Sequence, residues 1–317
     1  MKNFILPLLL LLGTMTRAQS YDVDKIKPEL KHNASVVIRM EEKVFDLKNI
    51  SHASYTFKTA ITILNDKGLS ESAVAEYYNN FSSISNLKAA IYNAKGEKIK
   101  EYRQADFKDK SAISDGSIYE DGRMKQLEFM HPTYPYTVEY SFTKDYTGLT
   151  SYPSWKPIYG FGYAVEQSSY TLRIPATMKF RSLMSKDLKT DSVKVKDKTE
   201  YKWAVKDFAA LEYEPMSAGL KNVSPWVNLA PNNFEYDHTQ GNLESWKNVG
   251  SWLYTLNSEP QMLPAAVKTK VAALVAHVND PKEKVRLLYQ YLQANTRYVS
   301  VQLGIGGFKP INADKVA

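Results

Sequence analysis

Alternation of large apolar side chains with polar or small ones is the feature that most restricts the fold of this chain. It recurs between residues 30 and 235, most clearly in 54–63 (SYTFKTAITI), 136–142 (YTVEYSF) and 200–207 (EYKWAVKD). A period of two places one face of a strand on a core and the other in water. This pattern is typical of antiparallel sheets rather than of parallel sheets covered on both faces. The sequence therefore predicts a large antiparallel, β-sandwich-like domain.

Two short turn sequences separate predicted strands. Asn65-Asp66-Lys67-Gly68 and Asn93-Ala94-Lys95-Gly96 both place glycine where a tight hairpin needs a positive φ. Strands at short spacing, with no helices between them, favour a sandwich or a large twisted sheet.

Helical periodicity replaces the alternation after about residue 231. Apolar residues recur at helical spacing in three stretches, 242–258, 264–280 and 280–298. We therefore predict an α+β chain, with a β domain over residues 19–235 and a helical segment over residues 236–317.

The last of these helices carries a start signal. Asp280 can cap it, Pro281 suits the first helical position, and Glu283 completes the sequence of a capping box. A helix that begins at Pro281 is the prediction.

The first 18 residues resemble an export signal rather than part of a fold. Lys2 precedes an apolar run from Phe4 to Leu12, which is short against the roughly 20 residues that a membrane-spanning helix needs. Thr16-Arg17-Ala18 then supplies small residues at the two positions that a signal peptidase reads. We expect cleavage after Ala18, export to the periplasm or the extracellular space, and no transmembrane helix in the mature chain. An uncleaved anchor is the alternative.

The sequence contains no cysteine. An exported chain without cysteine has no disulfides, so burial of side chains must stabilise its domains. These 317 residues also lack a thiol nucleophile, thiolate metal ligands and a redox pair.

Loss of the signal peptide lowers the net charge from +7 to +5, a modest excess that could favour anionic lipid or polysaccharide surfaces. Export argues against nucleic acid as a partner.

Sequence motifs for metals and cofactors are missing. No two of the five histidines stand at metal-ligand spacing. Neither a Gly-x-Ser-x-Gly elbow nor a phosphate-binding glycine loop occurs. We expect neither a metal nor a cofactor.

Aromatic residues concentrate between Phe129 and Tyr170, where twelve of the chain's 39 fall. An aromatic surface can stack on sugars or peptides, which makes Trp155 and Tyr159 candidate ligand contacts. Alternatively, these aromatic residues are simply buried by alternating strands.

A basic stretch at 179–207 is a second candidate surface. A solvated sheet face, or an edge strand whose charges prevent pairing with another chain, also accounts for it.

The residues after Pro281 resemble the first part of bacterial transglutaminase-like domains. Arg297-Tyr298 stands at the end of a helix, and Gly307-Phe308-Lys309-Pro310 matches a glycine-aromatic-x-proline stretch that follows a strand-like segment. The upstream region resembles the β-rich domain of unknown function that commonly precedes such domains in exported proteins of Gram-negative bacteria. The stretches that carry this second resemblance are 87–102, 131–142, 151–175 and 201–215.

The resemblance implies that the helical segment is the start of a transglutaminase-like, papain-like core. In that superfamily a Gly-Asp-Cys motif follows and supplies the nucleophile, with His and Asp on later strands. The given chain ends at Ala317 before that motif, so the resemblance implies that it is inactive as given.

The resemblance also places candidate site residues in this sequence. Gln302 lies where some members stabilise the oxyanion, although an ordinary polar strand position explains it too. Gly306, Gly307 and Phe308 lie where the resemblance implies a substrate cleft.

Three functions are compatible with these observations, and the sequence does not separate the third, a degenerate descendant of an enzyme that is kept only for structure, from the second. The first is the exported N-terminal portion of a transglutaminase-like protein that acts on peptide or amide bonds, by hydrolysis or acyl transfer, in a peptide or protein substrate. The second is a non-enzymatic periplasmic binding or assembly module with an envelope glycan or protein as its partner. An incomplete α/β core also exposes a strand edge and apolar surface. We therefore expect the isolated chain to self-associate.

Overall fold

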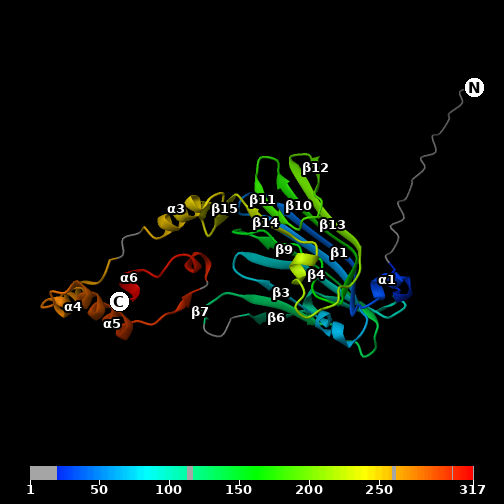
Figure 1. Ribbon diagram of the computed structural model, residues 1–317, viewed down its shortest axis with the longest axis horizontal. Coiled ribbons are helices and arrows are strands. Elements are labelled where there is room, and N and C mark those ends of the chain that lie inside the picture. Colours follow the sequence, from blue (N-terminus) through cyan, green and yellow to red (C-terminus); the bar gives the residue numbers. More distant parts are fainter. Residues whose placement is uncertain (1–19, 113–116, 259–261, 302, 317) are drawn as a thin grey trace, which may run out of the picture.

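The computed structural model of the protein describes residues 20–112, 117–258, 262–301 and 303–316. The predicted signal peptide and Gln302 lie outside these ranges. One broad sheet dominates the described chain. The longer helices α3 (Trp246–Leu256), α4 (Ala265–Val275) and α5 (Pro281–Asn295) gather beyond one end of it (Figure 1).

The main sheet has eight strands in the order β12-β13-β10-β1-β2-β9-β4-β5. They are β1 (Val36–Leu47), β2 (Ala53–Ile63), β4 (Ser82–Tyr92), β5 (Lys98–Arg103), β9 (Tyr136–Tyr146), β10 (Tyr163–Pro175), β12 (Asp191–Val195) and β13 (Lys198–Phe208). The three stretches with the clearest alternation form β2, β9 and β13, so the period-two pattern located real strands.

The sheet is mixed rather than antiparallel. β1 pairs with β10 in parallel, whereas its other neighbour, β2, is antiparallel to it. The prediction of an antiparallel domain is corrected here for a physical reason: alternation reports which face of a strand is buried, not the direction of its neighbour. Residues 147–162 carry the chain from β9 to the far side of β1, and a parallel pair requires such a crossover.

Four smaller groups of strands complete the β structure. They are β3 (Ala73–Tyr78), β8 (Arg123–Glu128) and β6 (Lys108–Ser111) in one sheet, β11 (Phe180–Met184) with β14 (Val227–Pro231), β15 (Asn233–Tyr236) with β16 (Thr239–Asn242), and β7 (Ser117–Tyr119) with β17 (Ser300–Val301). The β15–β16 hairpin spans residues 235 and 236, and the chain changes from strands to helices after it.

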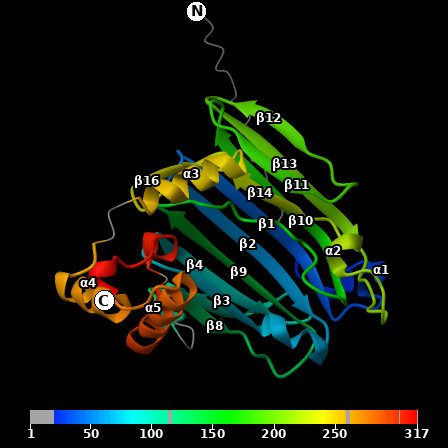
Figure 2. The same cartoon turned by 60° about the vertical axis from the view of Figure 1, so that its left-hand side comes forward.

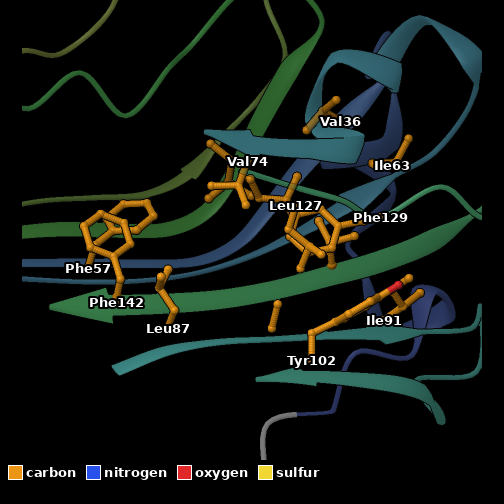
Figure 3. Packing of buried hydrophobic residues seen from close by; sticks show 14 of the residues in the cluster. Val36, Phe57, Ile63, Val74, Leu87, Ile91, Tyr102, Leu127, Phe129 and Phe142 are labelled. Carbon is orange, nitrogen blue, oxygen red and sulfur yellow. The ribbon is translucent and has the colours of Figure 1, made fainter. Parts of the chain in front are cut away.

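One face of the main sheet buries two apolar clusters. The three-stranded sheet covers the first, where Val74 and Leu127 join Phe57 and Phe142 (Figure 3). The β11–β14 pair and the crossover segment cover the second, which includes Trp155, Trp203 and Val227. The domain is therefore a partial sandwich, in which small second layers cover one face of a large sheet.

The segment before β1 packs on the opposite face. Ile26 and Leu30 contact Val37 and Ala164, which alternate with the inward residues of β1 and β10. Arg39 is buried on this side, where its Nε donates to Glu166 Oε2 at 2.8 Å and its other nitrogens donate to carbonyl oxygens of residues 20–22. These bonds pair the buried charge of Arg39 with Glu166 and connect residues 20–22 to the main sheet.

The two predicted hairpin turns fold differently. Gly96 has φ +78° and joins β4 to β5 as expected. The Asn65–Gly68 prediction is wrong: Asn65 instead caps a 3-10 helix by accepting a hydrogen bond from the Lys67 amide, and Gly68 does not have a positive φ. The strand that follows leaves the main sheet, so no tight turn is needed there.

Helices are short or lie after the β domain. The α-helices are α1 (Pro28–Lys31), α2 (Leu220–Val223), α3 (Trp246–Leu256), α4 (Ala265–Val275), α5 (Pro281–Asn295) and α6 (Ala313–Val316), and the 3-10 helices are η1 (Val23–Lys25), η2 (Asp66–Ser72), η3 (Gln104–Asp106) and η4 (Gly304–Gly307). The three longer helical stretches predicted from periodicity contain α3, α4 and α5.

Helix α5 begins as predicted, with one difference. Asp280 caps it by accepting a hydrogen bond from the Lys282 amide at 3.1 Å. Glu283 pairs with Arg286 on the helix surface, where the prediction had it completing a capping box. No residue of α3, α4 or α5 is buried, so these helices enclose no core among themselves in the described chain.

Candidate functional site

A glycine-rich loop, residues 303–310, packs against the end of the β domain. The Phe308 ring meets Trp252 of α3 edge to face at 5.2 Å between centroids, and Tyr236 of β15 at 6.0 Å. Phe234 contacts Trp252 at 5.0 Å, and Phe81 contacts Tyr236 at 4.6 Å. These five side chains, here called the ring cluster, join the loop, the β15–β16 hairpin and α3.

Backbone contacts fix the same loop. The Ile305 amide donates a hydrogen bond to Asp237 Oδ2 at 2.9 Å. Gly304 has φ +49°, and a Cβ atom there would lie 2.7 Å from that carboxylate and 3.2 Å from the Phe81 ring. The loop can approach the hairpin this closely because residue 304 has no side chain.

A cavity of about 650 Å³ lies beside the loop, a volume within the range of small-ligand sites. The predicted cleft residues Gly306, Gly307 and Phe308 all line it. Arg297 and Lys315 line it too, and among the residues that the structure describes none with a carboxylate side chain lines it. Such a lining suits a ligand with carbonyl or carboxylate oxygens.

Trp155, one of the two candidate ligand-binding aromatics, is fully buried. Its indole Nε1 donates to Ser168 Oγ at 2.9 Å, and its backbone pairs with Val227 of β14. Trp155 therefore packs as a core residue and offers no surface for stacking. The Tyr159 ring is 38% exposed, so the structure separates the two aromatics that sequence reasoning had grouped.

The Tyr159 hydroxyl contributes to a buried polar cluster between the two apolar clusters. It donates to Glu41 Oε2, and Ser168 Oγ donates to Glu41 Oε1 at 2.7 Å. Lys43 Nζ lies 3.3 Å from Glu41 Oε2 and 5.3 Å from the centroid of the Phe57 ring. Because the Glu41 side chain has no exposed surface, these three partners offset the cost of burying its charge.

Burial also sets the ionisation of groups in this region. Desolvation, reinforced by Glu41, raises the pKa of Tyr159 far above its usual value, so its hydroxyl remains a donor. Burial raises the pKa of Glu76, on β3, to about 7, although Lys144 and Lys43 partly oppose the shift. Lys144 itself has a pKa lowered by burial, and its Nζ donates to the Tyr77 carbonyl at 2.5 Å.

Sequence reasoning missed these charged groups, although a signal exists. Arg39, Glu41 and Lys43 interrupt an apolar run within β1, and such a run with apolar residues on both sides indicates a strand covered on both faces. A charge inside that run must have a buried partner.

Neither a metal site nor a membrane-spanning helix is found where the structure describes the chain. No three His, Asp or Glu side chains within 20–112, 117–258, 262–301 and 303–316 converge as metal ligands. None of the helices in those ranges is long and apolar enough to cross a bilayer.

Residues 51–212 match a family described as "Domain of Unknown Function with solved-structure structure (DUF3857)". The match takes in about half of the chain and includes most of the main sheet. The chain belongs to the DUF3857 family. No curated protein matches this DUF3857 chain in sequence.

Solved structures extend the likeness beyond the family match. A crystal structure of a "putative protease" from Parabacteroides distasonis ATCC 8503 superposes with a TM-score of 0.63 at 13% identity. It covers 89% of the DUF3857 chain, which itself spans only 55% of that protein. At this identity the likeness shows a shared fold.

Two further structures are similar at a much lower level. Legionella pneumophila aminopeptidase A with aspartic acid gives a TM-score of 0.31 at 8% identity, covering 69% of this chain and 24% of that one. An M1 zinc metallopeptidase from Deinococcus radiodurans gives 0.29 at 7% identity, covering 77% and 53%. Scores of this size carry no functional information.

Proposed function

We propose that this chain is the N-terminal portion of an exported, transglutaminase-like protein that acts on peptide or amide bonds by hydrolysis or acyl transfer. The fold likeness to the Parabacteroides distasonis protein supports the proposal most strongly, because it spans 89% of this chain and only 55% of a protein described as a "putative protease". The order of Arg297-Tyr298 and Gly307-Phe308-Lys309-Pro310, which resembles the start of transglutaminase-like domains, also supports it.

In this proposal the chemistry needs residues that the given chain does not contain. A histidine would take the proton of a cysteine thiol, and the resulting thiolate would attack the carbonyl carbon. The C–N bond would break as the histidine returns this proton to the leaving amine, and water or a second amine would then release the acyl group from the sulfur. The β domain would position a peptide or protein substrate, and the ring cluster would hold the glycine-rich loop beside the reacting bond. The cationic lining of the adjacent cavity would accept substrate oxygens.

The export part of the proposal rests on residues 1–18. Their short apolar run and the Thr16-Arg17-Ala18 sequence favour a cleaved signal, which would deliver the protein to the periplasm or the extracellular space.

The test is an intact-mass measurement on the native protein from the envelope fraction of its source cell, with alkylation of free thiols. A mass well above the 36.1 kDa of this chain, together with one reactive thiol, is the expected result. A mass slightly below 36.1 kDa with no thiol would overturn the enzymatic proposal. That outcome would favour the alternative, a non-enzymatic binding or assembly module.

A further inference from the structure

A second cavity, separate from the one beside the glycine-rich loop, lies between the β15–β16 hairpin and α3. Its volume is about 640 Å³, and none of its lining residues is charged. Strand β16 and helix α3 lie side by side there (Figure 2). The polar residues that line it include Asn233, Gln240, Asn242, Asn248 and Ser251.

The three asparagines form an ordered relay of side-chain amides. Asn248 Nδ2 donates to Asn242 Oδ1 at 2.6 Å, and Asn242 Nδ2 donates to Asn233 Oδ1 at 2.8 Å. The relay leaves Asn248 Oδ1 as an acceptor and Asn233 Nδ2 as a donor, each without a protein partner in the described chain. A fixed acceptor and a fixed donor in one cavity match a ligand whose groups both donate and accept.

Trp252 supplies a second, independent sign of a missing partner. Its ring lines the cavity and is held between Phe234 and Phe308, and its Nε1 is buried without a hydrogen-bond acceptor in the described chain. An unsatisfied buried donor is rare, because it loses its bond to water and gains nothing. A ligand hydroxyl, reached by a small movement of the indole, would satisfy it.

The chemistry of this cavity indicates the class of ligand. We propose that the cavity between β15–β16 and α3 binds a neutral carbohydrate. Sugar hydroxyls donate and accept at once, as the relay requires, and carry no charge that would need a counterion. The aromatic wall at Trp252 suits the apolar C–H face of a sugar ring.

A peptide is the less suitable ligand for this cavity. Peptides that bind as an added strand need a free strand edge. The outer edge of β15 is already used, because Glu235 bonds through its amide to Ile50 and through its carbonyl to Leu149. A peptide therefore cannot add a strand beside β15.

A neighbouring cavity extends the site. It has a volume of about 270 Å³ and shares Ile50 and Asn233 with the first. Lys179 and Glu244 line its far side. The two volumes together leave room for more than one sugar ring, so oligosaccharides are the better probes.

The test is calorimetric titration of the purified chain with two neutral tetrasaccharides, the β-1,4-linked tetramers of glucose and of N-acetylglucosamine. Trp252→Phe keeps the ring in its cluster but removes the N–H, so it should weaken binding about three- to tenfold, the usual effect of losing one hydrogen bond. Trp246→Phe is the matched control, because that indole is exposed on the same helix and does not line the cavity; it should bind like the wild type.

A second variant guards against a folding defect in the first. Ser251 is exposed on α3 and lines the cavity, so Ser251→Leu should obstruct part of the site, weaken binding and leave the fold intact. The proposal is overturned if neither tetrasaccharide binds, or if Ser251→Leu binds as tightly as the wild type. It is also overturned if a blocked alanine tetrapeptide binds in place of the sugars. The result does not depend on a thiol or on catalysis, so it is independent of the proposed enzymatic function.

Discussion

The β domain and the helical segment differ in how far they bury their apolar side chains. In the β domain many large side chains are fully buried, among them Trp155, Trp203 and Tyr170. In the helical segment no residue of α3, α4 or α5 is buried, and Trp246 is 91% exposed. Periodic apolar residues thus predict that a helix or strand has an apolar face. Only the three-dimensional structure shows whether other residues of the described chain bury that face.

Stability follows the same division. Burial of apolar surface is the main favourable term in folding, and it is concentrated in the two clusters of the β domain. Isolated helices of fewer than about 15 residues are marginal in water, so α3 and α4, with 11 residues each, depend on their neighbours. Four experiments test this contrast between the β domain and the helical segment.

The largest effect is expected from matched tryptophan substitutions in the two regions. Trp155→Ala should lower the free energy of unfolding by about 3–5 kcal/mol, because it leaves a cavity and removes the partner of Ser168. Trp246→Ala should change it by less than about 0.5 kcal/mol, because that side chain is exposed. Urea denaturation followed by circular dichroism measures both. Equal losses would show that the helical segment contributes to the cooperative core.

A pH-dependent effect on stability is expected from Glu76, in the β domain. Folding raises the pKa of Glu76 from its ordinary 4.5 to about 7, so the folded state holds a proton that the unfolded state releases between these values. This contribution to stability is present below about pH 4.5 and is lost as the pH rises towards 7. Glu76→Gln should therefore stabilise the protein by about 2 kcal/mol at pH 8 and hardly at all at pH 4. Parallel denaturation curves for both proteins across this range would contradict the assignment.

Loss of the contact between the β domain and the helical segment should lower stability less than loss of a core side chain. Its effect should stay local to the glycine-rich loop. Phe308→Ala removes the ring that packs on Trp252 and Tyr236, at a cost of about 1 kcal/mol. Hydrogen exchange of the Ile305 amide should accelerate, while exchange in β1 and β2 stays unchanged. Phe308→Leu is the control, because it keeps apolar volume at this position. Protection of Ile305 that survives Phe308→Ala would mean that Asp237 holds the loop alone.

The smallest effect on stability, but a clear effect on association, is expected at α5. Val285, Tyr289 and Leu292 lie on one face of this helix and are 67%, 58% and 52% exposed. Replacing Val285 and Leu292 with lysine should change the unfolding free energy by less than about 0.5 kcal/mol and reduce self-association in sedimentation velocity. Val193→Lys, at an exposed position on β12, is the control for added charge. A wild-type chain that stays monomeric at every concentration would refute the expected association.

The sequence predicted strands well where one face is buried and the other solvated. β2, β9 and β13 were located in this way. β1 shows no alternation over Val36, Val37 and Ile38, because Val36 and Ile38 are buried on one face of the sheet and Val37 on the other. The turns Asn65–Gly68 and Asn93–Gly96 share the pattern Asn-x-Lys-Gly but differ in structure. The difference arises from which strand pairs with which, and that information is non-local.

The candidate sites show the same limit. Gly306, Gly307 and Phe308 came from a resemblance, and the structure brings them to one cavity. The amide relay was missed because its asparagines lie on a hairpin and a helix that only the fold brings together. A cluster of uncharged asparagines between residues 232 and 248 was the available signal.

The parallel pairing of β1 with β10 has a consequence for how the chain acquires its structure. One edge of β1 stays open until residues 163–173 have been synthesised, and β10 in turn awaits residues 198–208 of β13. Closure over such long stretches of chain is slow, in the range of milliseconds to seconds. Helices such as α5 form from neighbouring residues in about a microsecond. Helix α5 can thus form well before β1 and β10 pair in the sheet, and the glycine-rich loop must wait for its docking surface.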